Sequence, residues 1–109
     1  HEKSDCIAYA KDFIDGNIQE PVALDEVASE VHMSRYYLCR RFKKATGMTL
    51  TEYVTERRVE MAKDMLVNTS LRVADIAFEV GFQSLSQFNR CFRKITGITP
   101  TKFRRSDPN

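Results

Sequence analysis

One stretch of this chain occurs twice, with the two copies about 50 residues apart. The first reads LDEVASEVHMSRYYLCRRFKKATGMTLTEY over residues 24–53, and the second reads VADIAFEVGFQSLSQFNRCFRKITGITPTKF over residues 73–103. From Ser34 onward each residue pairs with the one 50 positions later, so that Arg40 aligns with Arg90. Upstream the offset is one smaller, because one copy has an additional residue in its turn. Such a duplication indicates two units with the same architecture.

Each copy has the pattern of a short helix, a tight turn and a second helix. In the second copy Gly81 follows an apolar helical face and readily takes the positive φ of a tight turn. Ser84 can cap the next helix and Gly97 can end it. We expect this helix to bury one side, formed by Phe88, Cys91, Phe92 and Ile95. The pattern is typical of a helix-turn-helix, whose second helix fits the major groove of DNA.

The outer faces of the two second helices are polar and basic. N-terminal residues of such a helix point into the groove, and cations farther along neutralise phosphates. In the first copy we expect bases to be contacted by Arg35, Tyr36, Cys39 and Arg40, and phosphates by Lys43 and Lys44. In the second copy the outward residues are Ser86, Gln87, Arg90, Arg93 and Lys94.

The first copy differs from the second in its turn, where His32 replaces a glycine. Histidine tolerates positive φ less well than glycine, so the geometry of this turn stays open. Its second helix, residues 34–46, should turn Leu38, Phe42 and Ala45 toward the core. Either Tyr36 or Tyr37 can pack inward, and the pattern does not decide between them.

The chain of 109 residues has little Pro or Gly and no sustained alternation of apolar and polar residues. It is therefore predicted to be all-α. We expect a first subdomain over residues 5–50, a linker helix over 51–67 and a second subdomain over 72–105. The linker stripe comprises Tyr53, Val54, Ala62, Met65 and Leu66, with Arg58 in the gap. About 17 residues at 1.5 Å rise span roughly 25 Å, which lets two packed units reach major grooves about 34 Å apart.

Further helices are expected over residues 5–15, 24–31 and 100–105. The net charge is +2, but residues 1–30 carry −6 and the rest of the chain carries +8. The positive charge gathers in the second helices and the C-terminal tail, which is typical of a protein that binds a polyanion. Whether Lys102, Arg104 and Arg105 contact phosphates or are only solvated stays open. Phe103 is expected to pack on the second subdomain.

Several function classes are disfavoured by the composition. The three cysteines form no CxxC pair, and His1 and His32 complete no metal-binding set, so we expect neither metal nor cofactor and a reducing, cytoplasmic compartment. Cys39 is interpreted as a small groove-facing residue, with a redox sensor as the alternative. No apolar run is long enough to span a membrane. Neither HExxH nor a P-loop occurs, so an enzyme is not expected.

These residues resemble the DNA-binding domain of AraC/XylS-type transcriptional regulators. The run DIAFEVGFQSLSQFNRCFRKITGITPTKFR carries the resemblance most clearly, and the first copy and the linker RRVEMAKDMLVNT are also similar, so that it covers residues 7–105. It implies seven helices, with the third and sixth in adjacent major grooves. The implied base contacts are Tyr36, Cys39 and Arg40 in the first copy and Leu85, Ser86, Gln87 and Arg90 in the second. Ser34 and Ser84, which begin these two helices, complete the candidate DNA-binding residues.

The resemblance also implies a function, which is sequence-specific binding of double-stranded DNA in a bacterial transcription regulator. Such regulators usually activate transcription by contacting RNA polymerase, and most have a separate ligand-sensing or dimerising domain. Because the chain begins at His1 rather than Met, we expect that domain to be missing from it. The alternative function is a helical protein-interaction module with a degenerate helix-turn-helix. A third possibility is that only one copy contacts DNA.

Overall fold

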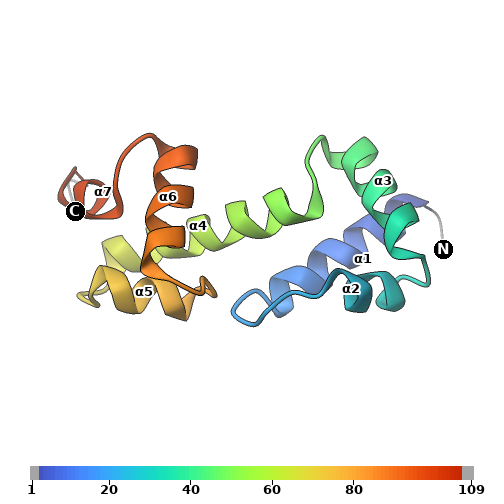
Figure 1. Ribbon diagram of the computed structural model, residues 1–109, viewed down its shortest axis with the longest axis horizontal. Coiled ribbons are helices and arrows are strands. Elements are labelled where there is room, and N and C mark those ends of the chain that lie inside the picture. The colour runs from blue at the N-terminus through green and yellow to red at the C-terminus, as the bar shows by residue number, and fades with distance from the viewer. Residues whose placement is uncertain (1–2, 107–109) are drawn as a thin grey trace. The chain divides into compact units, whose positions relative to one another are not determined.

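The computed structural model describes residues 3–106, and within them the chain forms seven helices and no strand (Figure 1). The helices are α1 (Lys3–Gly16), α2 (Leu24–Glu30), α3 (Arg35–Thr46), α4 (Leu50–Asn68), α5 (Val73–Glu79), α6 (Leu85–Thr96) and α7 (Pro100–Ser106). The all-α prediction with two helix-turn-helix pairs, α2–α3 and α5–α6, is confirmed. The ends of the helices lie within two residues of the predicted bounds.

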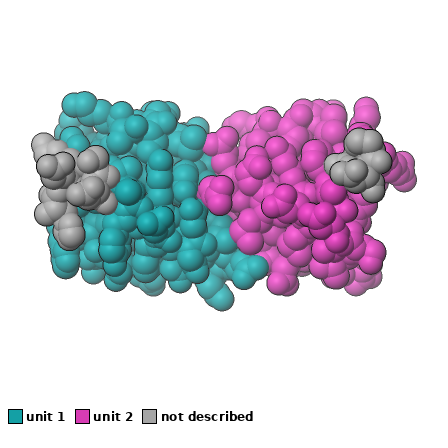
Figure 2. All heavy atoms as spheres, turned by 180° about the vertical axis from the view of Figure 1, so that it is seen from behind, with its two compact units in different colours: residues 1–54 teal, residues 55–109 magenta. Residues whose placement is uncertain are grey.

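The helices belong to two compact units (Figure 2). Unit 1 comprises residues 1–54 and unit 2 comprises residues 55–109. Helix α4 is continuous from one unit into the other and contributes core residues to both, which are Leu50 and Val54 in unit 1 and Val59, Ala62 and Leu66 in unit 2. The predicted linker stripe omits Leu50, which lies one residue before the predicted start of the helix, and Val59, because the stripe assumes a single buried face along the whole helix.

The core of unit 2 is built around two phenylalanines of α6. Phe88 and Phe92 have no solvent exposure. The ring centroid of Phe92 lies 5.6 Å from that of Phe88 and 5.5 Å from that of Phe103 in α7, both edge-on. Cys91 packs against the same core. The expected packing of Phe103 is therefore confirmed, and Cys91 lies on the inward side of α6 as predicted, where it is partly buried.

Unit 1 repeats this packing. Its Phe42 has no solvent exposure and meets the ring of Tyr53 edge-on at 5.4 Å between centroids. Tyr53 stands 50 residues before Phe103 and therefore takes the same place in its unit. Its hydroxyl donates to the carboxylate of Asp15 at 3.1 and 3.3 Å, which joins α4 to α1. The duplication thus extends from sequence to aromatic contacts.

Both turns use a left-handed residue at the equivalent position. Gly81 has φ 105° and His32 has φ 57°. The residue after each donates its backbone N–H to the helix carbonyl five positions earlier, at 3.0 Å. The additional residue of the second turn is therefore Gln83, which follows this shared bond. His32 therefore adopts the positive φ that Gly81 adopts in the second copy.

The prediction that Ala45 and Ile95 face the core is wrong. Both are exposed, Ile95 by 37%. The inward stripe of α3 continues from Phe42 to Thr46, four residues on, rather than to Ala45. The Thr46 hydroxyl donates to the carbonyl of Phe42 at 2.8 Å, and Thr96 repeats this bond with Phe92 at 2.8 Å. A four-residue step keeps a side chain on nearly the same helical face, so threonine takes the last inward position.

Arg104 has neither of the two roles that the sequence left open for it, phosphate contact or simple solvation. Its Nε donates to the carbonyl of Leu66 at 2.9 Å, and its terminal nitrogen donates to the carbonyl of Thr69 at 3.2 Å. The last carbonyls of a helix lack partners within the helix. Arg104 satisfies one of them in α4, that of Leu66, and also the carbonyl of Thr69 just beyond the helix end. Arg104 therefore ties α7 to α4 inside unit 2.

Replacing Arg104 by alanine is expected to lower the free energy of unfolding by about 1–2 kcal/mol, because two charge-assisted hydrogen bonds are lost. Arg105, its exposed neighbour, provides the control. Arg105→Ala should change stability by less than about 0.5 kcal/mol. Urea unfolding followed by circular dichroism measures both, and equal effects of the two substitutions would contradict the structural role.

Candidate nucleic-acid interface

Two helices of twelve residues, α3 and α6, carry the candidate side chains, and both are capped at each end. The hydroxyl of Ser34 accepts the N–H of Tyr37 at 3.1 Å, and that of Ser84 accepts the N–H of Gln87 at 3.1 Å. At the C-terminal ends Gly47 and Gly97 adopt left-handed conformations with φ 83° and 87°. The two serines therefore hold the helix starts in place, whatever else they contact.

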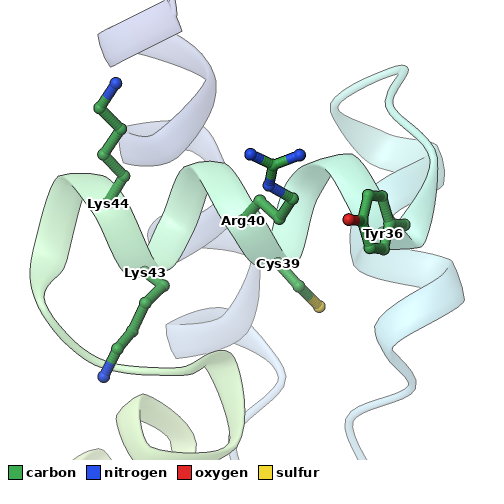
Figure 3. Close-up of a pocket in the computed structure, with 5 residues that line it drawn as sticks. All are labelled: Tyr36, Cys39, Arg40, Lys43 and Lys44. Atoms are coloured by element: carbon green, nitrogen blue, oxygen red, sulfur yellow. The ribbon is translucent and has the colours of Figure 1, made fainter.

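The outer face of α3 presents the predicted set together. Tyr36, Cys39, Arg40, Lys43 and Lys44 line one open hollow of about 430 Å³ (Figure 3). Tyr36 is 73% exposed and Tyr37 is 42% exposed, so neither tyrosine is buried in the core. Arg35 is also exposed. Leu38 and Phe42 are fully buried on the opposite side, and Cys39 is the one half-buried member of the outer set.

Basic side chains of α3 differ in their local contacts. Lys43 donates its ammonium group to the carbonyl of Gly47 at 3.0 Å, and the same nitrogen lies 4.0 Å from a carboxylate oxygen of Glu52. Lys43 thus also caps its own helix. The guanidinium carbon of Arg40 lies 5.6 Å from the ring centroid of Tyr36, a cation–π arrangement.

Helix α6 exposes its own polar face opposite buried Phe88 and Phe92. Leu85 is 38% exposed. Gln87 is half-buried, and its side-chain oxygen accepts the N–H of Gln83 at 3.2 Å, a bond that ties α6 to the turn. The remaining predicted residues of this helix are exposed, which are Ser86, Arg90, Arg93 and Lys94.

The set of candidate residues omits Asn89. It is exposed on α6 and stands 50 residues after Cys39, so the repeat places both on the same part of the helix surface. Applying the register of the duplication to every candidate of the first copy would have found it. An asparagine in a major groove can pair with adenine through both atoms of its amide.

The comparisons with known proteins agree with this geometry. A family model described as "Helix-turn-helix domain" matches residues 27–106. A crystal structure of an AraC-type DNA-binding-domain regulator from Chromobacterium violaceum superimposes with a TM-score of 0.89 at 31% identity, over 97% of this chain and 96% of that one. The chain belongs to the AraC family of helix-turn-helix DNA-binding domains. As a member of this family it is a DNA-binding domain of a transcription regulator.

Two further similar proteins extend the comparison. The DNA-binding domain of AdpA, solved in complex with a target DNA, matches with a TM-score of 0.86 at 25% identity, over 92% of this chain and 90% of that one. The bifunctional transcriptional activator and DNA repair enzyme AdaA of Bacillus subtilis is 39% identical over 101 residues, which is 93% of this chain. The chain spans 48% of the length of AdaA.

Two other features, a membrane-spanning helix and a metal-binding cluster, are absent from residues 3–106. None of the helices there combines the length and apolar character needed to cross a bilayer. No group of three or more His, Cys, Asp or Glu side chains in this region is placed to hold a metal ion, and His1 lies outside it. Cys6, Cys39 and Cys91 are free thiols.

Proposed function

We propose that this AraC-type domain binds double-stranded DNA sequence-specifically with both of its units, and that α3 and α6 enter successive major grooves. One observation carries the proposal. Each unit presents a twelve-residue helix, capped by the same residue types, with an arginine at the same register on the face opposite its buried side chains, which are Leu38 and Phe42 in α3 and Phe88 and Phe92 in α6. A second copy that did not bind DNA would not need this combination of features.

The candidate residues divide by the chemistry of their side chains. Arg40 and Arg90 each suit guanine, which accepts two hydrogen bonds from one guanidinium group. Cys39 and Leu85 offer apolar contact to the methyl group of thymine. Phosphates are neutralised by cations nearer the helix ends, which are Lys43, Lys44, Arg93 and Lys94, because these charges reach the backbone rather than the base edges.

The whole protein is proposed to be a bacterial activator that works in the cytoplasm and contacts RNA polymerase. AdaA is by name an activator, and this chain matches about half of it. That share supports a further proposal, in which the domain is joined to a sensing or dimerising domain in the full protein. The domain itself is proposed to act by binding rather than by catalysis.

Salt dependence tests the proposal directly. The logarithm of the association constant should fall linearly with the logarithm of salt concentration, with a slope of about −0.9 for each phosphate neutralised. Several phosphates should be involved, given the cations on both helices. Fluorescence anisotropy with a duplex selected from a random pool measures this slope. A slope near zero would favour the rival function, a protein-interaction module.

Footprinting on the same duplex separates two units from one. If both units bind, two adjacent major grooves on one face should be protected. Protection of a single groove would leave one unit without a DNA contact and would contradict the proposal for that unit only.

A further inference from the structure

We infer that Tyr36 is a positioning residue for Arg40, and that the two units therefore present their base-contacting arginines differently. The inference rests on the proposed DNA-binding function. Tyr36 and Arg40 are one helical turn apart on α3, where side chains four residues apart are neighbours. The guanidinium carbon lies 5.6 Å from the ring centroid, within the range in which the ring face attracts a cation.

The exposure of Tyr36 indicates that core packing is not its role. Its side chain is 73% exposed, more than any other large hydrophobic residue of the described region. Figure 3 shows Tyr36 and Arg40 on the same hollow of α3, together with Cys39. The cation–π arrangement with Arg40 is the interaction that the structure shows for this ring.

The equivalent positions on α6 hold no such pair. The residue 50 positions after Tyr36 is Ser86, which has no ring, whereas Arg90 retains the arginine. An unrestrained arginine loses side-chain entropy when it binds a base, and holding it near its bound geometry reduces that loss. Arg40 should consequently form its base contact at a smaller entropic cost than Arg90.

A double-mutant cycle on a selected duplex tests this role. Tyr36→Ser, which copies the residue of the second unit, should weaken binding about twofold to fivefold when Arg40 is present. In the Arg40→Ala background the same substitution should have no further effect. Tyr36→Phe keeps the ring face and should retain wild-type affinity. Discrimination at the base pair identified by Arg40→Ala should fall in Tyr36→Ser as well.

The matched control is the corresponding cycle in unit 2, with Ser86→Ala and Arg90→Ala, which should show no coupling. An equal effect of Tyr36→Ser in both Arg40 backgrounds would overturn the positioning role, since Tyr36 would then act on DNA or on the fold by itself. Coupling of the same size in unit 2 would overturn the difference between units. If neither arginine variant changes affinity, the proposed function fails and the inference fails with it.

Discussion

Replacing Arg90 by alanine should weaken binding to the target duplex by about 1–3 kcal/mol and remove the preference for one base pair, because the proposed bidentate pair with guanine would be lost. Arg90 is exposed on α6 and lies outside the core of unit 2, so the fold should be retained. Selection of duplexes from a random pool by the wild-type and variant domains measures the change in preference.

Lys94 on the same helix is the control for this experiment. It is exposed and lies one turn nearer the C-terminal end, where cations are proposed to meet phosphates. Lys94→Ala should weaken binding to all sequences alike and reduce the salt slope by about 1. If both substitutions changed only the general affinity, the proposed division between base-contacting and phosphate-contacting residues would be wrong.

Replacing Phe92 by alanine should lower the free energy of unfolding by about 3–5 kcal/mol, the cost of emptying a phenylalanine site in a packed core. The side chain has no exposure and contacts the rings of Phe88 and Phe103. A loss of this size is a large part of the stability of a small domain. Denaturant unfolding should show it as a lower midpoint.

Ile95 supplies the comparison, three residues farther along α6. Because its side chain is 37% exposed, Ile95→Ala should cost far less than Phe92→Ala. The sequence pattern predicts that both side chains face the core, whereas the structure buries only Phe92. The two substitutions therefore distinguish the two expectations. Similar losses for the two substitutions would mean that Ile95 is buried in solution.

The candidate site was largely predictable because it follows from periodicity and from the repeat. Arg40 and Arg90 stand opposite buried phenylalanines in both units, as helical spacing requires. The capping residues Ser34 and Ser84 were predictable for the same reason, since a cap acts on the backbone only a few residues away. Local rules of this kind need no knowledge of the remaining chain.

Other roles depend on which atoms meet after folding. Gln87 is bonded to the turn, and Lys43 caps α3, although both read from sequence as free polar groups on an outer face. Arg104 binds carbonyls 35 and 38 residues away in sequence. No short-range pattern encodes contacts over such separations.

The sequence by itself determined the all-α class, the two helix-turn-helix units and the helix faces that carry the basic residues, because a duplication and a 3.6-residue period are properties of the chain alone. Tertiary structure decided how each side chain at the edge of a face is used. The inward position at the end of α6 belongs to Thr96 and not to Ile95. Edge positions have nearly equal access to core and solvent, so their burial depends on the shape of the neighbouring helices.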